Sequence, residues 1–258
     1  MSLIHSTAII DPSAKIGANV SIGPYSVIGA NVEIGEDCWI GPHVVLNGPT
    51  ILGKRNKIFQ FASVGEACQD KKYDNEPTEL IVGDDNVFRE FTTIQRGTIQ
   101  DNGKTIIGSG NLFMAYVHVA HDCIVGDDTV MANQSTLAGH VKVGDHTILG
   151  GNVMIHQFCQ IGANCMIGIS SIIVKDVPDF LTCMGSPTAP KGMNFEGLKR
   201  RGVDKDDMRL LKRAYRIVYR EGHTLSEAIE ELSYDEKSNQ YVDQFVESLQ
   251  RSTRGIIR

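Results

Sequence analysis

Apolar positions recur at every sixth residue along most of the chain. The period holds over residues 4–64, returns over 82–94, and then runs through twelve consecutive apolar positions over 107–173. A period of six fits neither the 3.6-residue repeat of an amphipathic helix nor the simple alternation of a strand. It is typical of a parallel β-helix, in which short strands form flat sides and one apolar side chain per side points inward. With three hexads per coil, residues 18 apart are expected to stack on neighbouring rungs.

Two interruptions of the period predict loops that leave the coil. The segment at about 66–80 is polar and has lost the period, and Asp70 and Lys72 within it form a charge pair. The segment at about 99–105 carries one extra residue and predicts a smaller excursion. Loops on a rigid scaffold commonly carry binding residues. The length of the first segment and its charge pair favour a binding role over a tolerated insertion.

The hexads stop after Lys175, where prolines mark a change of structure. We expect a β-helix domain at 1–186 and an α-helical domain at 187–258, which covers the end of the coil or packs against a neighbour. Helix signals follow in order, and we expect three helices from them. These signals are Asp204 as an N-cap, Gly222 as a stop, Thr224 with Glu227 as a capping box, and an apolar pattern over 241–249.

Composition narrows the function without identifying it. The 258 residues carry 25 basic against 31 acidic side chains, a net charge of −6, which argues against nucleic acid as a partner. The sequence shows no signal peptide and no apolar run long enough to cross a bilayer, so a cytoplasmic protein is expected. Four cysteines occupy the small inward position of a hexad, which favours core packing over redox or metal chemistry. These are Cys38, Cys123, Cys159 and Cys165.

Five histidines between residues 118 and 156 stand out within this apolar scaffold. When residues 18 apart are stacked, one column contains His121, Gly139 and Gln157, and the next contains Asp122, His140 and Phe158. Three hypotheses account for the cluster. Histidine could act as a general base, with an adjacent backbone N–H as oxyanion donor. Imidazoles could bind zinc, as in the β-helical carbonic anhydrases. The coil could also be purely structural, although five histidines so close together make this the weakest of the three.

Several segments resemble one family over essentially the whole chain. HVAHDC, TLAGHV, IHQFC, NFEGLKRRG and STRGIIR, in this order, are similar to the UDP-N-acetylglucosamine O-acyltransferases. The resemblance implies a left-handed parallel β-helix followed by a C-terminal α-helical domain. It also implies a cytosolic homotrimer with sites between subunits. Such an enzyme transfers an (R)-3-hydroxyacyl group from acyl carrier protein to the 3-hydroxyl of UDP-N-acetylglucosamine, the first step of lipid A biosynthesis. No metal or organic cofactor is implied beyond the carrier's own phosphopantetheine.

The resemblance also implies roles for individual residues. His121 would be the general base, the Gly139 N–H the oxyanion donor, and Asp122 a support for His121, although neighbouring strand residues normally point to opposite faces. A larger set would bind the substrates. These residues are Asp70, Lys72, His118, His140, His156, Gln157, Asn194, Glu196, Arg200 and Arg201. The two arginines suit a diphosphate because a guanidinium offers a planar fork of donors.

Two positions bear on specificity. In relatives, the position of Ile169 lies along the acyl groove and limits the length of the acyl chain. A bulky residue there implies a short donor such as 3-hydroxydecanoyl. Gln95 replaces a histidine of many relatives, for which a hydrogen-bonding role is expected. Docking of acyl carrier protein could use Arg251 and Arg254, or the lysines around Lys199.

Two alternative activities remain. One is the later UDP-3-O-acylglucosamine N-acyltransferase, which normally carries an extra domain before the hexads, whereas here the hexads begin at residue 4. The more remote one is a metal-dependent carbonic anhydrase, for which the histidine spacing does not match.

Overall fold

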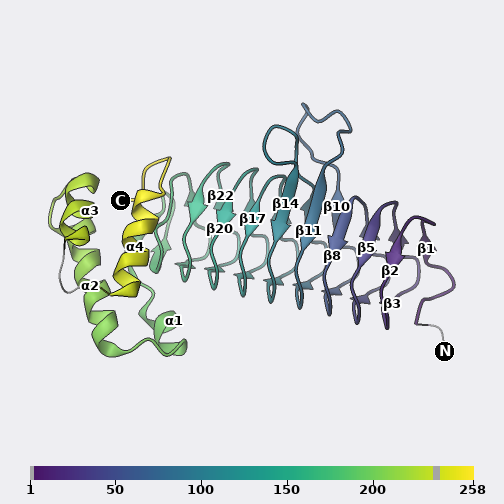
Figure 1. Cartoon of the computed structure of the whole chain (residues 1–258), viewed down its shortest axis with the longest axis horizontal. Helices are drawn as coiled ribbons and strands as arrows, with labels where there is room; N and C mark the ends of the chain where they lie inside the picture. The colour runs from purple at the N-terminus through teal and green to yellow at the C-terminus, as the bar shows by residue number, and fades with distance from the viewer. Residues whose placement is uncertain (1–2, 235–238) are drawn as a thin grey trace.

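A computed structural model describes residues 3–234 and 239–258 and shows a long coil that ends in helices (Figure 1). Over these residues the chain forms 27 strands and four α-helices, and the strands fall into three sheets, named here A, B and C. Sheet A contains β3 (Ser21–Ile22), β6 (Trp39–Ile40), β9 (Lys57–Ile58), β12 (Val87–Phe88), β15 (Leu112–Phe113), β18 (Val130–Met131), β21 (Ile148–Leu149), β24 (Met166–Ile167), β26 (Leu181–Met184) and β27 (Ala189–Met193). Sheet B contains β1 (Ile9–Ile10), β4 (Val27–Ile28), β7 (Val45–Leu46), β10 (Ser63–Glu66), β13 (Thr93–Gln95), β16 (His118–Val119), β19 (Thr136–Leu137), β22 (Met154–Ile155) and β25 (Ile172–Ile173). Sheet C contains β2 (Lys15–Ile16), β5 (Val32–Ile34), β8 (Thr50–Leu52), β11 (Glu79–Val82), β14 (Lys104–Ile107), β17 (Ile124–Val125), β20 (Lys142–Val143) and β23 (Gln160–Ile161).

The strand register confirms the predicted β-helix. Away from the two loops and the terminal hairpin, strands that follow each other within a sheet pair in parallel with residues 18 apart, as His118 does with Thr136. The periodic apolar residues form the core, where Ile28 and Leu137 are almost completely buried. The four cysteines predicted as core residues are buried free thiols, and so are Cys68 and Cys183.

Corners between the sheets rely on residues with left-handed backbone conformations. Asn19, Asp122, His140 and Phe158 are among the non-glycine residues at these corners with φ near +60°. Such a residue turns the chain sharply after a two-residue strand. We call the corner where sheet B turns into sheet C the histidine edge, and the corner where sheet A turns into sheet B the ladder edge.

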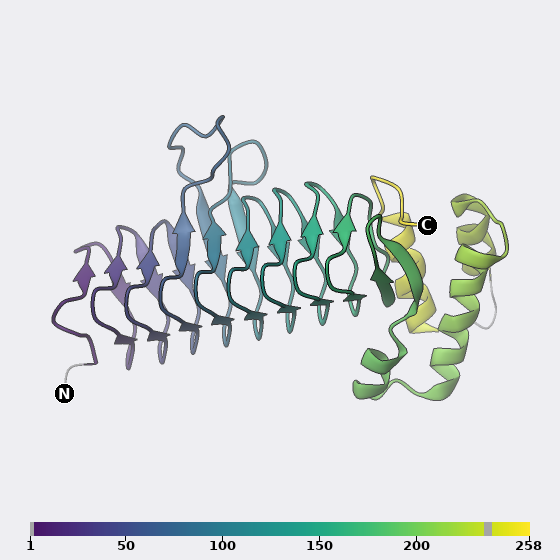
Figure 2. The ribbon, with the colours of Figure 1, turned by 180° about the vertical axis from the view of Figure 1, so that it is seen from behind.

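Both extruded loops leave the coil at the histidine edge and project to the same side (Figures 1 and 2). The first joins β10 to β11, and Ser63 pairs with Thr93, so the coil gains twelve residues beyond the usual 18. The second joins β13 to β14, and Thr93 pairs with His118, a gain of seven residues. The prediction of one extra residue in this second loop was therefore wrong. Seven is one hexad plus one residue, so the insertion shifts the apolar phase by a single position.

The coil ends in an antiparallel hairpin followed by helices. β26 pairs with β24 on one side and with β27 on the other, and the division predicted at residue 186 falls in the turn of this hairpin. The helices are α1 (Phe195–Arg200), α2 (Lys205–Arg220), α3 (Leu225–Ser233) and α4 (Gln240–Gln250). Asp204 caps α2, and Thr224 with Glu227 forms the predicted capping box of α3. The short helix α1 was not among the three expected.

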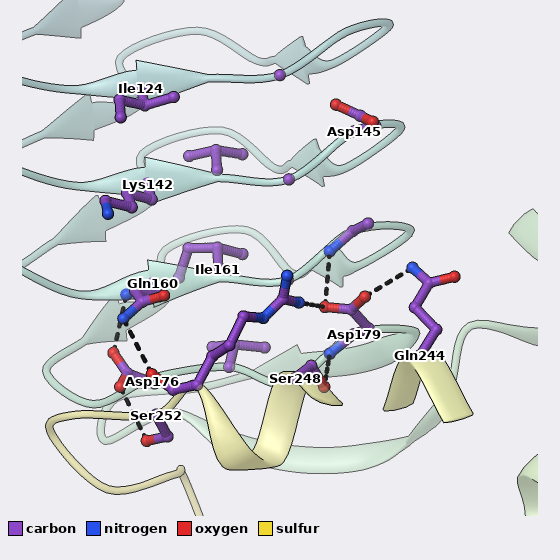
Figure 3. A pocket seen from close by; sticks show the side chains of 17 residues that line it. Ile124, Lys142, Asp145, Gln160, Ile161, Asp176, Asp179, Gln244, Ser248 and Ser252 are labelled. Carbon is purple, nitrogen blue, oxygen red and sulfur yellow. Dashed lines mark hydrogen bonds and ion pairs between the residues drawn. The ribbon is translucent and has the colours of Figure 1, made fainter. Parts of the chain in front are cut away.

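Helix α4 docks on the last coils through buried carboxylates (Figure 3). The side chain of Asp179 accepts hydrogen bonds from Gln244 Nε2 at 2.7 Å and Arg251 Nη2 at 3.3 Å. Asp176 accepts hydrogen bonds from the hydroxyl of Ser252 and from backbone N–H groups beyond it. A cavity of about 380 Å³ lies between sheet C and α4 and does not include the histidines of the predicted site.

Candidate active site

His121 and Asp122 form a closed pair at the histidine edge, between β16 and β17. His121 Nδ1 lies 2.7 Å from Asp122 Oδ2. Both residues belong to a corner, and Asp122 has φ +57°, so the pleat of a strand does not force these adjacent side chains apart. The contact fits the predicted support of His121 by Asp122. With Nδ1–H donating to the carboxylate, Nε2 is the free, basic nitrogen of the ring.

Asp122 is anchored from the second extruded loop. Its carboxylate accepts hydrogen bonds from the backbone N–H of Thr98 at 2.9 Å and from the Thr98 hydroxyl at 2.6 Å. Burial alone would raise the pKa of Asp122, but the hydrogen bonds from His121 and Thr98 outweigh it and lower that pKa. The group therefore carries its negative charge at neutral pH. Sequence reasoning missed Thr98, although its loop leaves the same edge one rung earlier.

Gly139 lies one rung beyond His121, against the face of the imidazole. A Cβ at this position would lie only 2.6 Å from both Cε1 and Nε2 of His121. Only glycine leaves room for the ring there. Among the described residues, the Gly139 N–H meets no acceptor, whereas the Gly139 carbonyl accepts the N–H of Phe158. A free amide thus lies beside His121, where the stacking of residues 18 apart places it.

His140 packs edge-on against His121, with ring centroids 5.0 Å apart. Its other side stacks on Phe158 at 4.4 Å, and its Nδ1 lies 3.0 Å from Asp101 Oδ2 in the second extruded loop. The aromatic support and the loop carboxylate hold His140 in one orientation. Asp101 is a second residue that the sequence did not single out.

His118 points outward from sheet B three residues before His121. Its Nδ1 lies 2.7 Å from the Thr93 hydroxyl on the preceding rung. Burial, and then the nearby His121, lower the pKa of His118. This imidazole is therefore neutral at physiological pH and can hydrogen-bond a substrate without adding charge.

The first extruded loop is tied to the coil close to this cluster. The Arg96 guanidinium donates to the Gly65 carbonyl at 2.6 Å and to the Tyr73 hydroxyl at 3.1 Å. Within the loop, the Asp70 carboxylate accepts the backbone N–H of Lys72 at 3.0 Å. Among the described residues the Lys72 ammonium forms no ion pair with Asp70, so the predicted charge pair was wrong.

The first extruded loop contains a buried thiol, Cys68. Its sulfur accepts the backbone N–H of Asp70 at 3.2 Å. Burial raises the pKa of the Cys68 thiol, and the charges of Asp70 and Asp122 raise it further. Gln95 is also buried, at the end of β13.

The remaining predicted residues divide into two groups. His156 and Gln157 are exposed on the histidine edge, one rung beyond Gly139 and His140. Glu196, Arg200 and Arg201 belong to α1 or its C-cap, past the last coil (Figure 2). A single chain therefore does not bring this second group to His121.

Asn194 and Ile169 have surroundings of their own. Asn194 caps α1 by accepting the Gly197 N–H at 3.1 Å, and its amide donates to the Asn164 carbonyl. Ile169 lies on the ladder edge beside Gly151 and is 72% exposed. In one chain, Ile169 is separated from His121 by the width of sheet B and by three coils along the axis.

The cluster also has the composition of a metal site. His121, Asp122 and His140 offer ligand atoms that lie within 4.8 Å of one another. Asp122 nevertheless already accepts three hydrogen bonds, and a cation would have to displace at least one of them. The geometry fits an oriented base better than it fits three free ligands.

Proteins similar to this chain match it over its full length. Residues 176–257 match the profile described as UDP N-acetylglucosamine O-acyltransferase, domain 2, and residues 104–139 match the bacterial transferase hexapeptide profile. Two relatives named acyl-[acyl-carrier-protein]–UDP-N-acetylglucosamine O-acyltransferase share 55% identity (Thiobacillus denitrificans) and 50% identity (Saccharophagus degradans) over all of both chains. The structure of LpxA from Acinetobacter baumannii superimposes with a TM-score of 0.98 at 48% identity, covering all of both chains. The structure of UDP-N-acetylglucosamine O-acyltransferase from Moraxella catarrhalis gives the same TM-score and coverage at 45% identity.

Hexapeptide repeats coiled into a β-helix, with an oriented histidine at one edge, define an acyltransferase of the hexapeptide-repeat class. The full-length identities resolve the family within that class. The chain belongs to the acyl-[acyl-carrier-protein]–UDP-N-acetylglucosamine O-acyltransferase family. Within the described residues, no helix is both long and apolar enough to span a membrane.

Proposed function

We propose that this protein transfers an (R)-3-hydroxyacyl group from acyl carrier protein to the 3-hydroxyl of UDP-N-acetylglucosamine, the first step of lipid A biosynthesis. The observation that carries the proposal is the contact among His121, Asp122 and Gly139 at one edge of the coil. The family's names supply the substrates. UDP-N-acetylglucosamine and acyl carrier protein are both soluble molecules, so we place the reaction in the cytoplasm.

The first step is general-base catalysis by His121. Nε2 takes the proton of the sugar 3-hydroxyl while the oxygen attacks the thioester carbonyl carbon. The imidazolium that forms is stabilised by the ionised Asp122, 2.7 Å from Nδ1. Asp122 also fixes the ring orientation, because its carboxylate is held in turn by Thr98.

The second step is collapse of the tetrahedral intermediate. Its oxyanion accepts a hydrogen bond from the Gly139 N–H, which has no acceptor within the described part of the chain. The carbon–sulfur bond then breaks, and the imidazolium returns its proton to the phosphopantetheine thiolate. The proton is conserved, so this chemistry needs no metal and no cofactor beyond the carrier's phosphopantetheine.

Substrate binding is assigned to the polar residues around this centre. His118, His140, His156 and Gln157 would contact the sugar or the diphosphate, and Asp70 and Lys72 would hold the sugar from the first loop. Asn194, Glu196, Arg200 and Arg201 would bind the nucleotide. Since α1 lies past the last coil, we propose a homotrimer in which a neighbouring subunit brings these residues to the histidine edge.

The decisive experiment is acyl transfer to UDP-N-acetylglucosamine from acyl carrier protein loaded with 3-hydroxyacyl chains of graded length. We expect transfer by the wild-type protein and a loss of at least about a hundredfold in His121→Ala. His146→Ala is the matched control, since His146 also lies at a corner, 3.6 Å from the carboxylate of Asp128, but on a different edge.

Treatment with a chelator distinguishes general-base catalysis from metal-dependent catalysis at the histidine cluster. Activity that survives extensive chelation agrees with an oriented base, because Asp122 already has its hydrogen-bond partners. Activity that chelation abolishes and zinc restores would overturn the base mechanism. Equal loss in His121→Ala and His146→Ala would also overturn it.

A further inference from the structure

Two consecutive residues of one coil close the neck of the first extruded loop. The Arg96 N–H donates to the carbonyl of Glu66, at the end of β10, at 3.0 Å. The Gly97 N–H donates to the carbonyl of Glu79, at the start of β11, at 3.2 Å. Both ends of the loop are therefore fastened to the segment that opens the second extruded loop.

The side chain of Arg96 continues into the first extruded loop. Its Nη1 donates to the Gly65 carbonyl at 2.6 Å, and its Nη2 donates to the Tyr73 hydroxyl at 3.1 Å. That hydroxyl donates in turn to the Glu76 carbonyl at 3.1 Å. One guanidinium thus links the beginning of the loop to its middle and, through the tyrosine, to a residue near its end.

The charge of Arg96 is buried without a counter-charge. The residue is 9% exposed, and it forms no ion pair with any residue that the structure describes. Its Nε is also buried and has no hydrogen-bond partner among those residues. An unpaired buried cation costs free energy of folding, and an apolar side chain of similar length would avoid that cost. Packing therefore does not explain the arginine, whereas its planar fork of donors suits two acceptors in different parts of the loop.

The same segment also holds the carboxylate of the proposed catalytic pair. Thr98, two residues after Arg96, donates to Asp122 from its backbone N–H at 2.9 Å and from its hydroxyl at 2.6 Å. Gly97 lies between them, and a Cβ there would lie 2.2 Å from the backbone nitrogen of Lys104. Two residue steps span at most about 7 Å. Residues 96–98 therefore join the first extruded loop to Asp122 over a short and closely packed stretch of backbone.

We propose that Arg96 is a positioning residue for the acyl transfer, because it holds the first extruded loop in place relative to His121 and Asp122. The inference rests on the proposed function, in which Asp70 and Lys72 of this loop hold the sugar. Arg96 acts through the loop and not on the reacting atoms. Binding of the sugar should therefore depend on Arg96 more strongly than the chemical step does.

Loss of the contacts of Arg96 should act on substrate affinity. A loop that occupies its binding position only part of the time raises the apparent dissociation constant in inverse proportion to that fraction. The bound sugar still meets the His121–Asp122 pair, because the hydrogen bonds from Thr98 remain. The KM for UDP-N-acetylglucosamine should therefore rise while kcat changes little.

The test compares Arg96→Lys and Tyr73→Phe with the wild type in steady-state transfer to UDP-N-acetylglucosamine. Arg96→Lys keeps the charge and removes the fork, whereas Tyr73→Phe removes only the hydroxyl that accepts from Arg96. We expect KM to rise about tenfold in Arg96→Lys and about threefold in Tyr73→Phe, with kcat within about twofold of the wild type. Because the two substitutions break one shared contact, the KM of the double variant should exceed that of Arg96→Lys by less than about threefold.

Arg55→Lys is the matched control. Arg55 donates two hydrogen bonds to the carboxylate of Asp85, at 2.7 and 2.6 Å, on the corner where sheet C turns into sheet A. The same substitution there should leave KM unchanged, since both loops leave the coil at the histidine edge.

Limited digestion with trypsin provides a second measurement that is independent of activity. Lys71 and Lys72 are exposed in the first extruded loop, and a protease cleaves such a segment when its backbone opens locally. Cleavage after these lysines, identified from the fragment masses, should be at least about fivefold faster in Arg96→Lys than in the wild type or Arg55→Lys. Circular dichroism must show unchanged β-structure, and Tyr73→Phe carries the test if Arg96→Lys fails to fold.

The outcomes separate this inference from the proposed function. A folded Arg96→Lys that is cleaved at the wild-type rate would overturn the inference. Faster cleavage with an unchanged KM, or a loss confined to kcat, would overturn it too. A wild type that binds UDP-N-acetylglucosamine but transfers no acyl group would refute only the proposed reaction, because the dissociation constant from calorimetry then replaces KM in the comparison. A wild type that does not bind this nucleotide sugar would refute both.

Discussion

At the scale of single residues, the site depends on contacts that no neighbouring side chain could replace. Asp122 turns towards His121 only because its backbone adopts the left-handed conformation, and the imidazole fits only because residue 139 has no side chain. Thr98 fixes the carboxylate from a loop that the hexads do not include. Three local features thus fix the position of one imidazole, that of His121.

Replacing Asp122 by Asn tests the charge of this carboxylate separately from its shape. We expect a fall in kcat of about a hundredfold, because the imidazolium loses its counter-charge. Stability should change with a defined sign. The pKa of Asp122 is lowered in the folded state, so its contribution is present above the unfolded pKa of about 3.9 and is lost as pH falls through the folded value.

Urea unfolding of Asp122→Asn and wild type at several pH values provides the measurement. The stability gap between the two proteins should be widest near neutral pH and should narrow below about pH 4. A gap that widens on acidification would contradict the assignment of an ionised, hydrogen-bonded carboxylate.

At the scale of elements, the junction between the coil and α4 contains a buried carboxyl group, Asp179, beside that of Asp176. Asp179 is 1% exposed and accepts hydrogen bonds from Gln244, Arg251 and the Ala163 N–H. Burial raises the pKa of this group, although Gln244 and Arg251 partly oppose the effect. The helix is therefore held to the coil by polar contacts that lie deep beneath it (Figure 3).

Asp179→Ala should loosen α4 from the coil. We expect a loss of about 2–4 kcal/mol, because three donors lose their buried acceptor at once. For a chain of this size, each kcal/mol corresponds to roughly 2–4 °C in Tm. Differential scanning calorimetry would show the shift. Asp206→Ala, at an exposed carboxylate of α2, should change Tm little, and equal shifts in the two variants would contradict the role of the junction.

The elements that carry a repeat or a capping signal in the sequence could be predicted, and the loops that carry neither could not. The coil, its core and the capped helices α2 and α3 follow from hexads and capping residues. The size of the second loop was misjudged because seven inserted residues look like one extra residue against a period of six. The partners Thr98 and Asp101 were missed since a loop that leaves the coil and returns carries no positional signal in the sequence.

At the scale of the whole molecule, we propose that the two ends of the acyl group lie at different edges of sheet B. The proposed catalytic residues His121 and Gly139 lie at the histidine edge, and Ile169 lies at the ladder edge, three coils farther along. If the acyl chain spans this distance, its far end meets Ile169. The preferred length of the acyl chain is then set by the assembled molecule and not by the catalytic residues.

Ile169→Gly should shift the preferred donor to longer 3-hydroxyacyl chains. Each additional buried CH₂ contributes about 0.8 kcal/mol, so a few carbons alter kcat/KM by orders of magnitude. Competition between donors of different length, with His121 unchanged, measures the shift. An unaltered preference in the folded variant would refute the assignment of Ile169 as the end of the groove.

The number of residues in the first extruded loop has an evolutionary consequence. Its twelve inserted residues equal two full hexads, so the repeats on either side keep the same phase. The coil therefore continues after the loop in an unchanged register. Such an insertion can be exchanged as a cassette, because every rung beyond it keeps its register. The part of the protein proposed to hold the sugar can therefore diversify by recombination while the histidine and its amide partner keep their geometry.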